Sequence, residues 1–148
     1  MRTRKGDLLT ELVLEIFKLN GLLISEGDHI SGKCGLSSAR WKVLGSLALS
    51  ENPLTVAQIA RMMGQARQSV QRIANDMAKS GYFIWEDNPA DKRAKLLKIT
   101  EKGKRAYKLL DSAQAPWANE SAKQLDMQDL KSALIVLRQL IDHFGTSN

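Results

Sequence analysis

The sequence predicts a mainly α-helical chain with one small β-hairpin, arranged as a winged helix-turn-helix between N-terminal and C-terminal helices. Three observations lead to this prediction. Two short amphipathic segments meet at Gly64, two strand-like runs enclose a cationic tip, and apolar stripes of helical period lie near both ends. With 148 residues, 43% of them hydrophobic, the chain can bury one substantial core, so we expect a single domain over residues 1–148.

The first segment of helical period covers roughly residues 7–26. Its apolar stripe is wider than packing against one neighbour requires, so we expect this helix to bury two faces. The stripe consists of Leu8, Leu9, Leu12, Val13, Ile16, Phe17, Leu19, Leu22 and Leu23. Charged residues interrupt the segment, and no run of about 20 apolar residues occurs in the chain, so we expect no signal peptide, no membrane span and a cytoplasmic location.

The helix-turn-helix belongs to a predicted winged helix-turn-helix region over residues 37–100. Thr55 is placed to cap a short amphipathic helix that ends at Gly64. A second helix is expected from Arg67 to Lys79, with apolar residues at helical spacing on one face and Gly81 as its stop. In a helix-turn-helix, the second helix is the one that enters a major groove of DNA.

The outward face of this second helix carries side chains that can pair with base edges and phosphates. Only Asp76 opposes them, and the helix contains no Glu, whereas an ordinary exposed helix mixes Glu with Lys to form ion pairs. We expect Gln68, Ser69, Gln71 and Arg72 to contact base edges and nearby phosphates, and Arg67, Asn75 and Lys79 to contact phosphates.

The wing is predicted from two strand-like runs, residues 82–86 and 95–99, separated by eight residues that include an Asn-Pro turn signal. Lys92 and Arg93 lie in this gap, and such a tip can reach a DNA minor groove. Asp91 is placed to hold the guanidinium of Arg93 through a charge-assisted hydrogen bond. Taken alone, these residues fit a solvated charged hairpin equally well.

The distribution of charge favours a polyanionic partner. Eleven Lys and Arg residues and five Asp and Glu residues lie between Thr55 and Arg105, an excess of +6 that equals the net charge of the whole chain. The cationic excess is therefore confined to the predicted helix-turn-helix and wing. A winged helix that docks another protein is the main alternative, but it would have little need of Arg67, Arg72 and Arg93 without acidic partners.

The sequence contains no recognisable catalytic or metal-binding motif. The two histidines, His29 and His143, lie 114 residues apart and neither belongs to a nucleophile, carboxylate-pair or metal-ligand pattern. We therefore expect no catalytic residue, no metal and no cofactor. Cys34 is the only cysteine, which excludes an intrachain disulfide.

Two further helices are expected in the C-terminal part. One covers residues 100–123 with a kink at Pro116, and the last covers residues 127–144 with Asp126 as its N-cap. The last helix carries two adjacent apolar seams, Leu130, Leu134, Leu137 and Ile141 and beside them Ala133, Val136, Leu140 and Phe144. We expect residues 7–26 and 101–144 to be the dimerisation helices of a homodimer, with one closed monomeric core as the alternative.

These motifs, in this order, resemble the MarR family of multiple-antibiotic-resistance-type transcriptional regulators over nearly the whole chain. The similar segments are Gly35–Leu44 for the second helix, Leu54–Ala60 for the first reading helix, and Asp91–Arg93 with Leu97–Gly103 for the wing and the helix entry. The turn before the second reading helix lacks the acidic residue often found there, so Ala66 cannot cap that helix.

A homodimer of this kind would bind double-stranded DNA at a pseudo-palindromic operator, with half-sites about 10 to 10.5 bp apart, and repression is its default action. The resemblance also implies release by a small, often aromatic, effector bound between the dimer helices and the reading domain. The candidate effector-binding residues are Leu12, Ile16, His29 and Trp41. A tryptophan on an apolar helix face is more often part of the core. The family has thiol-switched members, but only Lys33 and Arg40 lie near enough to activate Cys34, so an inert thiol is favoured.

Overall fold

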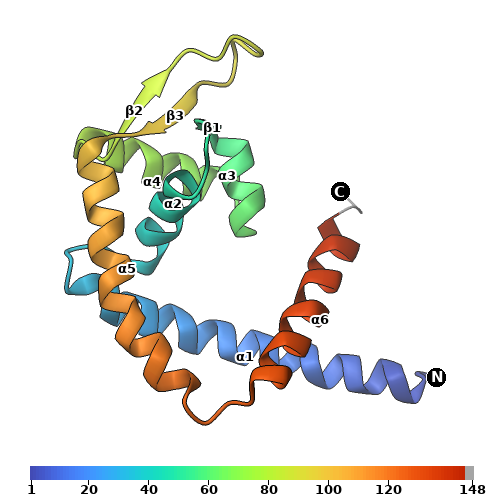
Figure 1. The fold of residues 1–148 in the computed structure, drawn as a ribbon. Coiled ribbons are helices and arrows are strands. Elements are labelled where there is room, and N and C mark those ends of the chain that lie inside the picture. The colour runs from blue at the N-terminus through green and yellow to red at the C-terminus, as the bar shows by residue number, and fades with distance from the viewer. Residues whose placement is uncertain (146–148) are drawn as a thin grey trace. The chain divides into compact units, whose positions relative to one another are not determined.

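The computed structural model describes residues 1–145 as six helices and three short strands (Figure 1). The elements are α1 (Arg4–Gly32), α2 (Ser38–Ala48), β1 (Leu54–Thr55), α3 (Val56–Met63), α4 (Arg67–Lys79), β2 (Phe83–Glu86), β3 (Leu96–Ile99), α5 (Glu101–Ala122) and α6 (Met127–Gly145). This confirms the predicted fold class, a mainly helical chain with a helix-turn-helix and a small hairpin. The chain forms two compact units, residues 1–113 and 114–148, and α5 runs from the first into the second. The single-domain organisation stays a prediction.

The helix-turn-helix has the boundaries that its sequence predicts. Oγ1 of Thr55 accepts a hydrogen bond from the backbone N–H of Gln58 at 3.2 Å, and Oε1 of Gln58 accepts one from the backbone N–H of Thr55 at 2.8 Å. This reciprocal pair satisfies two amides at the start of α3. Gly64 ends α3 in the left-handed conformation at φ +63°, which glycine adopts without steric cost. As predicted, no side chain caps α4 at Ala66.

The core of the first unit determines which face of α4 is exposed. The buried apolar side chains come from α2 and the loop before it, α3, α4, the hairpin and α5: Leu36, Val43, Leu44, Leu47, Ile59, Ala60, Val70, Ile73, Ala74, Met77, Phe83, Leu97 and Leu110. Four of them lie at helical spacing on one side of α4. Their burial leaves the polar residues of α4 on the opposite side, facing solvent.

The three strands form an antiparallel sheet in the order β1-β3-β2. In the hairpin, Phe83 is opposite Ile99 and Glu86 is opposite Leu96. Both strands begin one residue later than predicted, since a strand edge leaves little signal in the sequence. The two-residue strand β1 was not predicted, because so short a strand shows no alternation of polar and apolar residues. It pairs with β3 and so joins the start of α3 to the base of the wing.

A close contact joins the hairpin to α5. The backbone N–H of Thr100 donates to the carbonyl of Tyr82 at 3.0 Å, and its hydroxyl donates to the carbonyl of Gly81 at 2.6 Å. Gly103 follows one turn later and is buried against this corner. A Cβ atom at position 103 would collide with the Tyr82 carbonyl oxygen and would lie 2.6 Å from Cγ1 of Ile99. Only glycine fits the approach between α5 and the hairpin.

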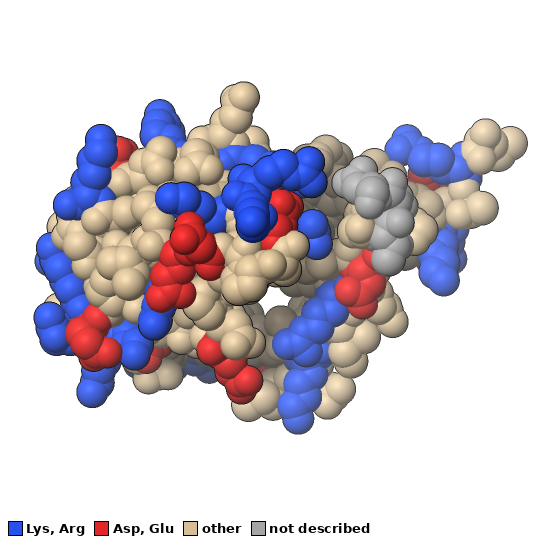
Figure 2. Space-filling model, turned by 90° about the horizontal axis from the view of Figure 1, so that it is seen from above, with Lys and Arg blue, Asp and Glu red and all other residues tan. Residues whose placement is uncertain are grey.

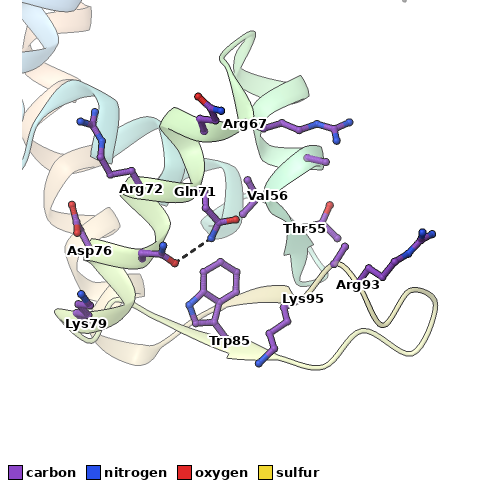
Figure 3. A pocket seen from close by; sticks show the side chains of 14 residues that line it. Thr55, Val56, Arg67, Gln71, Arg72, Asp76, Lys79, Trp85, Arg93 and Lys95 are labelled. Atoms are coloured by element: carbon purple, nitrogen blue, oxygen red, sulfur yellow. Dashed lines mark hydrogen bonds between the residues drawn. The ribbon is translucent and has the colours of Figure 1, made fainter.

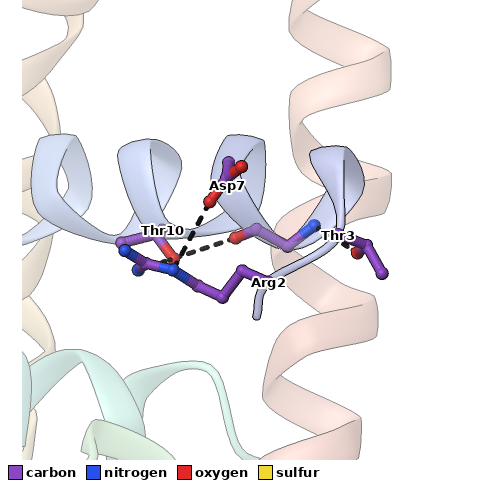
Figure 4. A network of polar contacts seen from close by, with 5 residues as sticks. Arg2, Thr3, Asp7 and Thr10 are labelled. Carbon is purple, nitrogen blue, oxygen red and sulfur yellow. Dashed lines mark hydrogen bonds and ion pairs between the residues drawn. The ribbon is translucent and has the colours of Figure 1, made fainter.

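Helix α1 is longer than the predicted residues 7–26. Its start is held by polar contacts beyond that range: Oγ1 of Thr3 accepts from the backbone N–H of Gly6 at 3.1 Å, and Arg2 lies 3.4 Å from Asp7 (Figure 4). At its other end, Oδ1 of Asp28 accepts from the backbone N–H of Ser38 at 2.8 Å, which ties α1 to the start of α2. This hydrogen bond lowers the pKa of the Asp28 carboxyl below its ordinary value.

In the second unit, Asp126 caps α6 as predicted, since its Oδ1 accepts from the backbone N–H groups of Gln128 at 2.8 Å and Asp129 at 3.1 Å. The proline at position 116 lies within α5 and does not end it. No residue of α6 is buried in the monomer. Over the described part of the chain, no helix combines the length and apolarity that a bilayer span requires.

Replacing Gly103 with Ala should destabilise the protein by about 1–3 kcal/mol, because the added methyl group overpacks the corner between α5 and the hairpin. The free energy of unfolding in urea measures the effect. Gly32→Ala is the matched control, since a Cβ at this helical position meets nothing within 4 Å. Equal stability of the two variants would show that the corner relaxes without cost.

Candidate nucleic-acid interface

A groove of about 1050 Å³ lies between α4 and the wing (Figure 3). One wall is the polar face of α4, and the other is formed by Trp85 on β2 together with residues 93–95. The start of α3 closes one side through Thr55, Val56 and Ala57. The groove exists because α3, α4 and the hairpin share the core of the first unit.

The structure brings most of the predicted DNA-contacting residues to this groove. Seven of the nine line it: Arg67, Gln68, Gln71, Arg72, Asn75, Lys79 and Arg93. Ser69 is half-buried on α4 and Lys92 is exposed at the wing tip, and neither is among the lining residues. The residues therefore lie together, while the contacts that each would make with DNA remain a prediction.

Seven lining residues lie outside the predicted set, and two of them, Trp85 and Lys95, add aromatic and cationic surface; the others are Thr55, Val56, Ala57, Asp76 and Ala94. Trp85 is half-buried, packs partly against the core and contributes an aromatic surface to the groove. Its place two residues after the buried Phe83 puts both on the face of the strand that packs on α4, and this alternation could have identified it. Lys95 directly follows the predicted wing gap and extends its cationic surface.

The groove is cationic. Five of its lining residues are Arg or Lys, namely Arg67, Arg72, Lys79, Arg93 and Lys95, and one is acidic, Asp76. Within residues 1–145, only Arg93 of these five cations forms an ion pair. Seen from above the wing, Lys and Arg side chains spread over much of the visible face, with Asp and Glu between them (Figure 2). The unpaired cations are free to meet the phosphates of a polyanion.

The predicted contact between Asp91 and Arg93 is present. Oδ1 of Asp91 accepts from the backbone N–H of Arg93 at 2.9 Å and lies 3.5 Å from Nε of its guanidinium. The Arg93 side chain nevertheless stays 94% exposed. Asp91 therefore shapes the turn of the wing tip and leaves most of the guanidinium available to a partner.

The four candidate effector-binding residues lie outside the groove. Leu12 and His29 are exposed on α1, and Ile16 is half-buried on the same helix. Trp41 is half-buried on α2 and packs against the core, as its position on an apolar helix face suggested. Their role in ligand binding stays a prediction.

Chemically reactive groups are not gathered at the groove. Among residues 1–145, no three His, Cys, Asp or Glu side chains lie close enough together to hold a metal ion. Burial and then the nearby Asp111 raise the pKa of Tyr107, but this residue lies on α5 away from the groove. Cys34 is half-buried and packs against the core.

The sequence is similar to a known family and to other bacterial proteins. The MarR family model matches residues 35–94, which include α2, the helix-turn-helix and the wing tip. The uncharacterized protein Rv2011c of Mycobacterium tuberculosis is 34% identical over 136 residues, covering 92% of this chain and 94% of that protein. The transcriptional activatory protein BadR of Rhodopseudomonas palustris is 22% identical over 142 residues, covering 94% and 81%.

Solved structures share the fold at low sequence identity. The transcriptional regulator BldR of Sulfolobus solfataricus has a TM-score of 0.85 at 18% identity, covering 95% of this chain and 99% of that one. Reduced AbfR bound to DNA has a TM-score of 0.72 at 19% identity, with coverage of 97% and 99%. CouR of Rhodococcus jostii RHA1 bound to p-coumaroyl-CoA has a TM-score of 0.77 at 13% identity, with coverage of 88% and 91%.

The family match covers α3, α4, β2 and the wing as far as residue 94, and the shared fold extends over nearly the whole chain. On this evidence, the chain belongs to the MarR family of transcriptional regulators.

Proposed function

We propose that this protein is a sequence-specific DNA-binding transcriptional repressor that acts as a homodimer and is released from its operator by a small molecule. The observation that carries the DNA-binding part is the groove, where unpaired cations stand beside the exposed polar face of α4. A helix presented in this way enters a major groove, and a cationic wing reaches the flanking minor groove. The solved structure of AbfR bound to DNA supports this use of the fold.

Each part of the surface takes a role in this proposal. Gln68, Ser69, Gln71 and Arg72 contact base edges and nearby phosphates, Arg67, Asn75 and Lys79 contact phosphates, and Lys92 and Arg93 occupy the minor groove. Lys95 adds a phosphate contact at the base of the wing, since it is exposed on the same groove. Phosphate contacts position the protein, and base contacts select the sequence.

Homodimer formation is proposed from apolar faces that the monomer leaves exposed. On α1, Phe17 is 69% exposed and Leu22 is 60% exposed, and on α6, Ile141 is 67% exposed. Soluble monomers rarely expose so many large apolar side chains. A two-fold dimer would present two α4 helices to successive major grooves, which requires a pseudo-palindrome with half-sites about 10 to 10.5 bp apart.

Repression follows in this proposal because a dimer bound across a promoter excludes the polymerase. BadR is named an activatory protein, so a promoter-reporter assay with and without the protein decides the direction of regulation. Effector release is supported by CouR, which was solved with p-coumaroyl-CoA bound. For this chain we propose a smaller aromatic ligand near Leu12, Ile16, His29 and Trp41.

DNA affinity should fall steeply as salt concentration rises, because bound Lys and Arg residues release counterions from the phosphates. Lys79→Ala should reduce the slope of log affinity against log salt by about 1 per contact. Titration of duplex DNA at several salt concentrations, followed by fluorescence anisotropy, measures both slopes. Lys108→Ala is the matched control, since Lys108 is exposed on α5 outside the groove. A slope near zero for the wild type would refute DNA binding.

Ile141→Asp should convert the dimer to a monomer and weaken operator binding, because it places a carboxylate in the apolar seam of α6. Sedimentation equilibrium measures the oligomeric state. The side chain of Ile141 is exposed in the monomer, so the substitution should leave the monomer fold intact. Gln139→Asp, on the opposite side of α6, is the control and should remain dimeric. An unchanged dimer of the Ile141 variant would exclude this seam from the interface.

Effector binding should be reciprocal with DNA binding: the factor by which a ligand lowers operator affinity must equal the factor by which operator lowers ligand affinity. A screen of aromatic acids, phenols and cationic dyes, read by Trp41 fluorescence after Trp85→Phe and Trp117→Phe, measures ligand affinity with and without operator. His29→Ala should weaken the ligand more than it weakens DNA. If no compound shifts either equilibrium, a constitutive DNA-binding protein is the better account.

A further inference from the structure

One pair of polar side chains on the exposed face of α4 is already joined before any partner binds. Nε2 of Gln71 donates a hydrogen bond to Oδ1 of Asn75 at 3.1 Å, one helical turn further along (Figure 3). Both residues are exposed and both line the groove between α4 and the wing. Gln68, one turn before Gln71 on the same face, has no such bond within the described part of the chain. The two glutamines therefore differ in how firmly their amides are held.

The bond to Asn75 determines what Gln71 can offer to a base. A primary amide has two N–H groups and one carbonyl oxygen. With one N–H used by Asn75, Gln71 retains one donor on Nε2 and one acceptor on Oε1, the two atoms bonded to its Cδ. In the major groove, adenine presents the complementary pair, the N7 acceptor and the N6 amino donor. Guanine presents two acceptors, cytosine a single donor, and thymine an acceptor beside a methyl group.

We propose that Gln71 recognises an adenine in each half-site, and that Asn75 is a positioning residue that orients the Gln71 amide for this contact. The proposal rests on the DNA-binding function proposed above and names the base that this part of the site selects. It also changes the role expected for Asn75, from a phosphate contact to a residue that acts through Gln71.

The surroundings of the pair favour this arrangement. Arg72 and Lys79 line the same groove and form no ion pair within residues 1–145, so they are available to hold the phosphates on either side of the base contact. Ile73 and Ala74, which lie between Gln71 and Asn75 in the chain, are buried and anchor this turn of α4 to the core. An amide held in one orientation loses less conformational entropy on binding than a free one, which favours binding in that orientation.

The test begins with the full-length wild type and a pool of random duplex DNA, from which the operator is selected. Affinities are then measured for the selected site with all four base pairs at each position. At one position of each half-site, adenine should be preferred over the other bases by about fivefold or more, as expected for a bidentate amide contact. Gln71→Ala should abolish this preference. Gln139→Ala, which changes an exposed glutamine of α6 outside the groove, is the matched control and should leave the preference in place.

Two substitutions of Asn75 separate positioning from simple contact. Asn75→Ala should reduce the adenine preference several-fold, because the Gln71 amide is then free to rotate. Asn75→Asp keeps an acceptor for Nε2 of Gln71 and should keep the preference, while its charge weakens binding to every sequence alike. A role of Asn75 in phosphate contact alone would give the opposite pattern, with an unchanged preference in the Ala variant. Circular dichroism checks that each surface variant is folded.

Several outcomes would overturn the proposal. A guanine preference that depends on Gln71 would mean that the amide presents two donors and that the pair is oriented the other way. Equal loss on all four bases in Gln71→Ala would make Gln71 a general contact, and an unchanged preference in Asn75→Ala would remove the positioning role. Each of these leaves DNA binding intact. Failure of the proposed function is a separate result, recognised by binding without salt dependence or by the absence of any selected sequence.

Discussion

The burial of one face of α4 is the constraint on which the rest of the site depends. Val70, Ile73, Ala74 and Met77 are at most 8% exposed, and they pack with side chains of α2, α3 and the hairpin. Side chains project from a helix in all directions around its axis, so burying the apolar face of α4 leaves the opposite, polar face exposed to solvent. Because these apolar residues are buried, the polar residues that alternate with them along α4 point into solvent. The reading surface is therefore a consequence of the core.

The wing is positioned by the same core through different contacts. Phe83 and Leu97 are buried from the hairpin, while β1 connects β3 to the start of α3. At the far end of the hairpin, Gly103 lets α5 approach the Tyr82 carbonyl closely. Lys102 strengthens this corner, since its ammonium donates to the carbonyl of Ser80 and lies 4.6 Å from the centre of the Tyr82 ring. The end of α4, the hairpin and the start of α5 are thus joined at one place.

This arrangement leaves most Lys and Arg side chains of the groove without acidic partners in the described part of the chain, and in a DNA complex the phosphates would take that place. Surface cations usually gain little from ion pairs, so a protein loses little stability by leaving them free. At the groove, four of the five cations form no ion pair within residues 1–145. The exception, Arg93, is held by Asp91 through its backbone and keeps an exposed guanidinium. Groove cations without an acidic partner remain available to the phosphates of DNA.

The sequence by itself determined the local features that depend on short-range chemistry. The boundaries of α3 and α4 follow from the cap at Thr55, the glycine at 64 and the apolar spacing between them, and each of these acts within a few residues. The same spacing predicted which side of α4 is exposed, and hence the α4 residues that line the groove.

Only the tertiary structure decided what depends on neighbours distant in the chain. The strand β1 exists because β3 offers a partner, and Trp85 reaches the groove because the hairpin packs on α4. The C-terminal end of α1 is tied to the start of α2 by the hydrogen bond between Asp28 and Ser38, ten residues apart. Pairing and hydrogen bonding across such distances have no periodic signal in a sequence, because they depend on where the folded backbone brings the partners.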